Sequence, residues 1–189
     1  MKEINRLLEE VCYELDEIGL DYLVVGGSAL EARGYEIGTE DIDFVITPKG
    51  FDEIDDKLEK SSRFRIIDKI KTMIETKFFF ENSWRTVEFL DPGYFSGERS
   101  PDEFIDYVKR YRSTKERVGY IVDPEVVFFM RLMVVDWEIY VQKIMRDIKA
   151  GLSIDLLQDV IRISENLGVK EKIEPRVEKT KEIIEVQME

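Results

Sequence analysis

Two aspartates, Asp41 and Asp43, interrupt an otherwise apolar segment that ends in Phe-Val-Ile. In a β-strand, residues two positions apart point to the same side and lie roughly 6 to 7 Å apart, so both carboxylates should share one face. An unpaired buried carboxylate is costly unless another group offsets its charge. A divalent cation bound between the two would do so. Mg²⁺, or Mn²⁺ in its place, suits these hard oxygen ligands and leaves coordination positions free for substrate phosphates.

A glycine pair and a serine, Gly26-Gly27-Ser28, follow an apolar segment and precede these acids. Glycines allow backbone N–H groups to approach a phosphate closely. Ser28 adds a hydroxyl where a helix should begin, and the dipole of a helix favours anions at that end. The sequence therefore predicts an anion site beside a metal site, a combination that would hold a nucleoside triphosphate through Mg²⁺.

A third carboxylate would either activate an attacking hydroxyl as a general base or hold a second metal ion. Glu88 is the best candidate because it also interrupts an apolar strand. Asp91 is the second candidate, although an aspartate before Pro-Gly is typical of a turn. A triphosphate also needs cationic partners. The cationic candidates are Arg33, Lys49, Arg131, Lys143 and Arg146. The aromatic candidates for an acceptor or base-stacking pocket are Tyr94, Phe95, Tyr107 and Tyr111.

The elements that must position these residues follow from hydrophobic periodicity and from turn residues. An amphipathic helix is expected over residues 2–18, and Ser28 is expected to cap a short helix that runs to about Gly34. Strands are expected at 20–25, 41–47, 63–67, 77–80 and 86–90, with a helix around 51–58.

From Ser100 onward the pattern predicts helices alone. They are expected over 100–111, as one long helix from 123 to about 151, over 153–167 and over 174–186. The long helix is apolar nearly all round, so it should be buried between the sheet and the later helices or in a homodimer through the helical region. The chain is therefore expected to form a core domain at residues 1–115 and a helical C-terminal domain at 116–189.

The composition excludes several classes of function. The 189-residue chain contains no histidine, which removes catalytic triads, histidine general bases and the usual zinc sites. Cys12 is the only cysteine, so a disulfide framework is excluded. A net charge of −13 argues against a dedicated DNA-binding module. No apolar run is long enough to cross a membrane and no signal peptide is found, so a cytoplasmic protein without a membrane partner is expected.

Four segments resemble the nucleotidyltransferase superfamily related to DNA polymerase beta, in its branch of minimal and toxin-like members. They are Gly26-Gly27-Ser28, Gly34-Tyr35, Thr39-Glu40-Asp41-Ile42-Asp43 and Val87-Glu88-Phe89-Leu90. The resemblance covers about the first 90 residues, and beyond them only the general plan of a helical C-terminal region agrees. It implies an α+β fold in which a mixed β-sheet is flanked by helices and followed by that helical region.

The resemblance also implies Mg²⁺-dependent transfer of a nucleoside monophosphate to a hydroxyl, with release of pyrophosphate. The catalytic metal ligands would be Asp41, Asp43 and Glu88, and the nucleotide-binding residues Gly26, Gly27, Ser28 and Thr39. ATP or another triphosphate would be the donor, and a small molecule, a protein hydroxyl or an RNA end the acceptor.

Two other classes of function remain open. Relatives often carry an arginine where this chain has Ile37, so an inactive module that binds a nucleotide or a partner is the alternative. A purely structural protein that binds a helical partner would take up neither metal nor nucleotide.

Overall fold

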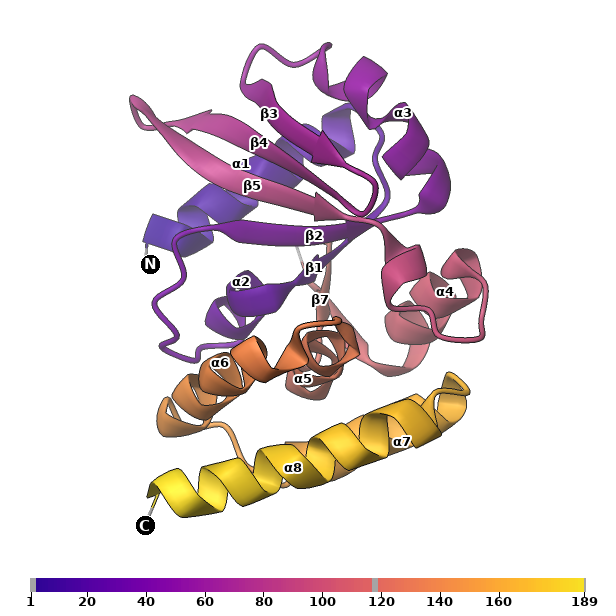
Figure 1. The fold of residues 1–189 in the computed structure, drawn as a ribbon. Coiled ribbons are helices and arrows are strands. Elements are labelled where there is room, and N and C mark those ends of the chain that lie inside the picture. Colours follow the sequence, from indigo (N-terminus) through magenta and orange to yellow (C-terminus); the bar gives the residue numbers. More distant parts are fainter. Residues whose placement is uncertain (1–2, 117–118, 189) are drawn as a thin grey trace.

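A mixed sheet of seven strands forms the centre of the computed structural model, which describes residues 3–116 and 119–188 (Figure 1). The order across the sheet is β3-β4-β5-β2-β1-β7-β6. The strands are β1 (Tyr22–Val25), β2 (Ile42–Ile46), β3 (Phe64–Ile70), β4 (Met73–Phe80), β5 (Ser83–Leu90), β6 (Ser113–Glu116) and β7 (Gly119–Val122). The predicted α+β class is confirmed.

Helices cover the sheet and extend below it in the view of Figure 1. They are α1 (Glu3–Glu17), α2 (Gly26–Ala32), α3 (Pro48–Leu58), α4 (Pro101–Tyr111), α5 (Pro124–Met133), α6 (Trp137–Lys149), α7 (Leu156–Asn166) and α8 (Lys170–Met188), with a 3₁₀ turn, η1 (Pro92–Tyr94). Helix α1 passes behind β3, β4 and β5, and its buried stripe of Leu8, Val11 and Leu15 forms part of the core. Burial of this amphipathic stripe stabilises the helix on the sheet.

The central strand β2 brings distant parts of the sequence together. It pairs antiparallel with β1 and parallel with β5, so Asp43 lies in register with Glu88. Phe44 and Ile42, the neighbours of Asp43, are fully buried. The alternation predicted for this strand is therefore present: the apolar residues pack inward while Asp43 points to the other side.

Two strands were not predicted. β6 and β7 form an antiparallel hairpin, and β7 also pairs parallel with β1. β6 has the sequence Ser-Thr-Lys-Glu, which carries no apolar alternation, and β7 has only four residues. The predicted domain boundary between residues 115 and 116 falls inside β6, so the helical region begins only at Pro124.

The predicted long helix over 123–151 is two helices, α5 and α6. Val134 adopts an extended conformation directly after Met133, and Asp136 occupies the N-cap position of α6. Residues 134–136 therefore separate the two helices, and the valine pair there does not by itself account for the break, since Val126 and Val127 lie inside α5. As predicted, α5 is buried along its whole length.

Two helix starts also differ from the prediction. Helix α2 begins at Gly26 with Val25 as its N-cap residue, so Ser28 lies in its first turn and does not cap it. Helix α8 begins at Lys170, before the predicted start at residue 174, and continues through Pro175. Ile173 and Val177 are fully buried on either side of Pro175, and this packing outweighs the backbone hydrogen bond that proline cannot donate. Across the described ranges, every helix is too short or too polar to cross a membrane.

Candidate active site

A cavity of about 620 Å³ opens where β2 and β5 face α5 and α6. Nearly all of the predicted site residues line it. They are Gly26, Gly27, Thr39, Asp41, Asp43 and Glu88. Tyr94 and Phe95 line the same cavity, whereas Tyr107 and Tyr111 line another one beside α4.

Three carboxylates dominate the electrostatics of this cavity. Burial raises the pKa of Asp43 to about 7, and repulsion from Asp41 and Glu88 adds to this effect. Burial also raises the pKa of Glu88, together with repulsion from Asp41 and Glu75. Lys143 and Arg131 act in the opposite direction on the pKa of Asp43 but offset only part of this repulsion, so the three acids form a site of excess negative charge.

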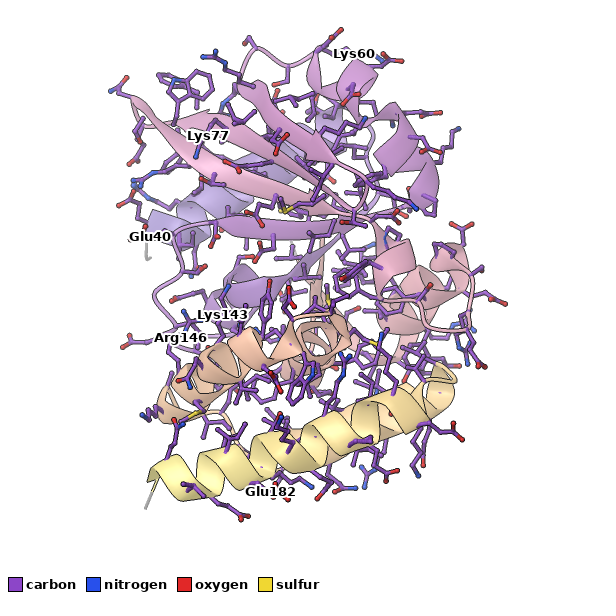
Figure 2. All side chains as sticks on the ribbon, viewed as in Figure 1. Glu40, Lys60, Lys77, Lys143, Arg146 and Glu182 are labelled. Carbon is purple, nitrogen blue, oxygen red and sulfur yellow. The ribbon has the colours of Figure 1, made fainter. Side chains whose placement is uncertain are left out.

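The cations of the cavity come from α5 and α6. Arg131 is buried and forms an ion pair with Asp147, and Arg146 contacts the same carboxylate at 3.0 Å. Lys143 differs, because its ammonium group lies 5.1 Å from the centre of the Tyr140 ring and its charge lowers the pKa values of Asp43 and Glu88. Figure 2 shows Lys143 and Arg146 together on α6, below the sheet. Lys143 is therefore the cation best placed to meet an incoming anion.

The other two predicted cations lie outside the cavity lining. Arg33 donates to the carbonyl oxygens of Val122 and Ile121 and pairs with Asp123 at 2.5 Å, so it ties α2 to β7. Lys49 is exposed on α3 and lies 3.8 Å from Glu53. Their roles are structural, as one would expect for most surface arginines and lysines.

The glycine pair makes room for the acids. Gly26 has φ of +63°, and a Cβ atom there would lie 1.8 Å from Oδ2 of Asp43. A Cβ atom on Gly27 would lie 2.8 Å from Oγ1 of Thr39. Thr39 Oγ1 in turn donates to Oδ1 of Asp41 at 2.8 Å. Each glycine therefore allows one acid, directly or through Thr39, to pack against the start of α2.

Ser28 lies behind the cavity and does not line it. Its side chain is buried, and its Oγ donates to the carbonyl oxygen of Val25 at 2.9 Å and accepts from the backbone N–H of Asp43 at 3.3 Å. Both interactions fix β2 against the first turn of α2. The hydroxyl predicted to bind phosphate is thus already used inside the protein.

Ser28→Ala is expected to lower the free energy of unfolding by about 1 to 3 kcal/mol, because it leaves the N–H of Asp43 without this partner. The Michaelis constant for the nucleoside triphosphate that the sequence predicts as a substrate should change little. Urea unfolding and steady-state kinetics on the same preparation separate the two effects. A large rise in that constant at unchanged stability would instead indicate a direct phosphate contact.

Two further acids have structural roles that periodicity alone did not reveal. Glu31 on α2 is buried, and its Oε1 accepts from the backbone N–H of Gly38 at 2.6 Å, which fixes the loop that carries Thr39. Asp91, the second candidate for the third carboxylate, accepts from the N–H of Gly93 at 2.8 Å and caps η1. No pattern in the sequence indicated the role of Glu31, whereas the position of Asp91 before Pro-Gly had indicated a turn.

The donor set of the cavity suits a hard divalent cation. Within residues 3–116 and 119–188, no three histidine, cysteine or acidic side chains are placed so that together they could hold a metal ion, so a cation here would have at most two such ligands from the protein. Mg²⁺ commonly uses one or two carboxylates, and waters and substrate phosphates complete its coordination. Asp41 and Asp43 can supply the carboxylates, and the unbalanced charge at Asp43 is what a bound cation would relieve.

No family model and no curated protein matches the sequence. Three solved structures are similar to it. JHP933 from Helicobacter pylori aligns over 100% of this chain and 96% of its own, with 10% identity and a TM-score of 0.47. A "putative nucleotidyltransferase" from H. pylori aligns over 100% and 99%, with 11% identity and a TM-score of 0.48. The "putative nucleotidyltransferase" TM1012 from Thermotoga maritima aligns over 75% and 91%, with 18% identity and a TM-score of 0.44. Similarities at this level identify neither a family nor an activity.

Proposed function

We propose that this protein transfers a nucleoside monophosphate from a nucleoside triphosphate to a hydroxyl group and releases pyrophosphate. The observation that carries the proposal is the register of β2 and β5, which places Asp43 beside Glu88 at a cavity that Asp41 and Lys143 also line. Carboxylates facing a cavity with raised pKa values are typical of catalytic sites. The resemblance of the Gly-Gly-Ser and Asp-x-Asp segments to nucleotidyltransferases points to the same reaction.

Each side chain has a part in this reaction. Asp41 and Asp43 would hold Mg²⁺ or Mn²⁺, which when bound neutralises phosphate charge and polarises the phosphoryl group. The acceptor oxygen attacks the α-phosphorus, the bond from that phosphorus to the bridging oxygen breaks, and pyrophosphate leaves. Glu88 takes the proton of the acceptor hydroxyl, a task for which its raised pKa is suited, or it holds a second ion. The acceptor is a small molecule, a protein hydroxyl or an RNA end.

A thermal-shift screen of the four nucleoside triphosphates, with and without Mg²⁺, tests the proposal. A ligand that binds only the folded state raises the melting temperature, by an amount that grows with the ratio of its concentration to its dissociation constant. One triphosphate is expected to raise it with Mg²⁺ present, but not with Asp43→Ala. Pyrophosphate release with that nucleotide then separates an enzyme from an inactive module, which would bind without turnover. If the protein binds neither metal nor nucleotide, both the enzyme and the inactive binding module are contradicted.

Lys143→Ala is expected to raise the Michaelis constant for the triphosphate by about ten- to a hundredfold, because a charged hydrogen bond contributes roughly 1.5 to 3 kcal/mol. Steady-state kinetics of pyrophosphate release measures the change. Lys149→Ala removes the same charge from the same helix outside the cavity, so it should leave the constant within about twofold. If Lys143→Ala and Lys149→Ala raise the Michaelis constant equally, Lys143 contributes only to the overall electrostatic potential around α6.

A further inference from the structure

A second cavity, of about 830 Å³, opens beside α4 and shares no lining residue with the candidate active site. Three arginines and two tyrosines line it: Arg99, Arg110, Arg112, Tyr107 and Tyr111. In Figure 1, α4 lies at the right edge of the molecule and α6 at the lower left. The two cavities therefore open in different parts of the protein.

The lining of this second cavity is more basic than the protein as a whole. The chain has 41 acidic and 28 basic residues, yet the lining has three arginines and only two acids, Glu103 and Asp106. The carboxylate of Glu103 is already engaged, because it accepts from the backbone N–H of Ser100 at 2.9 Å in the capping box of α4. That hydrogen bond leaves the negative charge of Glu103 in place, and Glu125 pairs with Arg112, so the cavity can bind an anion through the N–H donors of Arg99 and Arg110 rather than through an excess of positive charge.

The three guanidinium groups differ in how firmly they are held. Arg99 donates through Nε to the carbonyl oxygen of Asn166 at 2.7 Å, which leaves its two terminal nitrogens for a ligand. Arg112 is fixed by the hydroxyl of Tyr107 at 3.4 Å and by Glu125 at 3.2 Å. Arg110 is exposed and, within the described ranges, forms no ion pair. One or more of these groups can bind a phosphate through paired N–H donors.

Two aromatic rings stand beside these cations. The centres of Tyr107 and Tyr111 are 5.8 Å apart, and the ring of Tyr111 is 63% exposed. The guanidinium of Arg110 lies 5.8 Å from the centre of the Tyr111 ring, and that of Arg99 lies 5.5 Å from the centre of Tyr107. An exposed ring next to a guanidinium is a surface on which a nucleobase can stack, whatever its identity.

We propose that this cavity is a second binding site, for a nucleotide unit whose phosphate contacts the arginines and whose base stacks on Tyr111. The proposal is independent of the activity assigned to the first cavity, because none of its residues lies there. A free mononucleotide and a nucleotide within a single strand offer the same chemistry. The experiment must therefore distinguish these two sources.

Fluorescence anisotropy of a labelled single-stranded RNA of about ten nucleotides, measured in EDTA, tests this site. Arg110→Ala and Tyr111→Ala should each weaken binding about tenfold, the size of one stacking or phosphate contact. Arg110→Lys and Tyr111→Phe should retain most of the affinity, since they keep the charge and the ring. Binding should weaken with added salt, and less steeply for Arg110→Ala.

Two control substitutions show whether the loss of RNA binding is specific to this cavity. Lys60→Ala removes one positive charge at the far end of the molecule, as Figure 2 shows, and should leave binding unchanged. Lys49→Ala removes one from α3, outside the linings of both cavities, and should do the same. Competition by a free mononucleotide as strong as by the unlabelled RNA would identify the isolated nucleotide as the ligand, and weaker competition would identify the strand.

Three results would overturn the proposal. One is the absence of RNA and mononucleotide binding to the unmodified protein. Another is binding that survives both Arg110→Ala and Tyr111→Ala with unchanged affinity. The third is competition by inorganic phosphate as effective as by a mononucleotide, which would leave no role for the base.

Discussion

Asp43→Asn is expected to reduce nucleotide transfer by about 10³-fold or more while making the metal-free protein more stable. An asparagine keeps the shape of the side chain but loses the negative charge that would hold the cation. A catalytic metal ion contributes several kcal/mol to transition-state stabilisation, and each 1.4 kcal/mol or so corresponds to a tenfold change in rate. Pyrophosphate release, measured with the nucleotide found by thermal shift, gives this ratio.

The expected gain in stability follows from the environment of Asp43. Burial, with repulsion from Asp41 and Glu88, raises its pKa from the ordinary 3.8 to about 7 in the folded protein. A carboxyl group with a higher pKa in the folded than in the unfolded state binds its proton more tightly when folded. Its favourable contribution is therefore complete below pH 3.8, declines as the pH rises towards 7 and is lost above that.

The pH dependence of this gain can be measured directly. Asparagine is neutral at every pH, so in EDTA the melting temperature of Asp43→Asn should exceed that of the unmodified protein by several degrees above about pH 7. For a protein of this size the difference is about 2 to 4 °C for each kcal/mol. It should shrink as the pH falls and approach zero only at about pH 3, where Asp43 is protonated in both the folded and the unfolded state.

Mg²⁺ and a surface control complete the test. Adding Mg²⁺ should raise the melting temperature of the unmodified protein but not that of Asp43→Asn. Asp52→Asn makes the same chemical change at an exposed position on α3 and should alter neither stability nor activity by a measurable amount. A metal-free Asp43→Asn protein that melts below the unmodified one at about pH 8 would contradict this account.

The sequence identified residues of the cavity where a local pattern and the long-range structure point to the same side chains. Asp41, Asp43 and Glu88 were recognised because acids in apolar strands are rare, and all three line one cavity. The α+β class followed from periodicities and from the family resemblance. The parallel pairing of β2 with β5, by contrast, could not be derived from spacing, because the two strands are far apart in the sequence.

The errors share a physical cause, which is that tertiary packing outweighs local preference. Pro175 lies inside α8 because its neighbours are buried, and the β6–β7 hairpin forms although β6 is polar, because β7 can pair with β1. Ser28 was assigned to phosphate from its type and place. Its actual partners are the carbonyl oxygen of Val25 and the N–H of Asp43, and the second of these depends on a strand that comes later in the chain.

The glycine pair is the clearest case in which the neighbours of a residue could not be predicted from the local sequence. Glycines before a helix were interpreted as an approach route for phosphate, and Gly26 and Gly27 do line the cavity. Their close neighbours, however, are Asp43 and Thr39, which no local pattern could have indicated. Space for the acids is therefore a requirement at these positions in addition to any contact with substrate.

Gly26→Ala is accordingly expected to lower stability by about 3 kcal/mol or more and activity by about 10²-fold or more. An alanine at φ of +63° costs roughly 1 to 2 kcal/mol by itself, and displacing the carboxylate of Asp43 adds a comparable amount. A shift of about 1 Å in a group that positions the reaction is enough for such a loss of rate. Urea unfolding and pyrophosphate release measure the two effects.

Gly38→Ala is the control for Gly26→Ala, because it introduces an alanine at a positive φ without a contact with Asp43. Gly38 has φ of +71°, and a Cβ atom there would have no neighbour within 4 Å, so only the backbone cost of about 1 to 2 kcal/mol should appear. In the Asp43→Ala background the two closest contacts of the new Cβ disappear, and Gly26→Ala should cost less there by about 1 kcal/mol or more. Equal costs for Gly26→Ala and Gly38→Ala, with no coupling to Asp43, would mean that the glycine does not shape the acidic site.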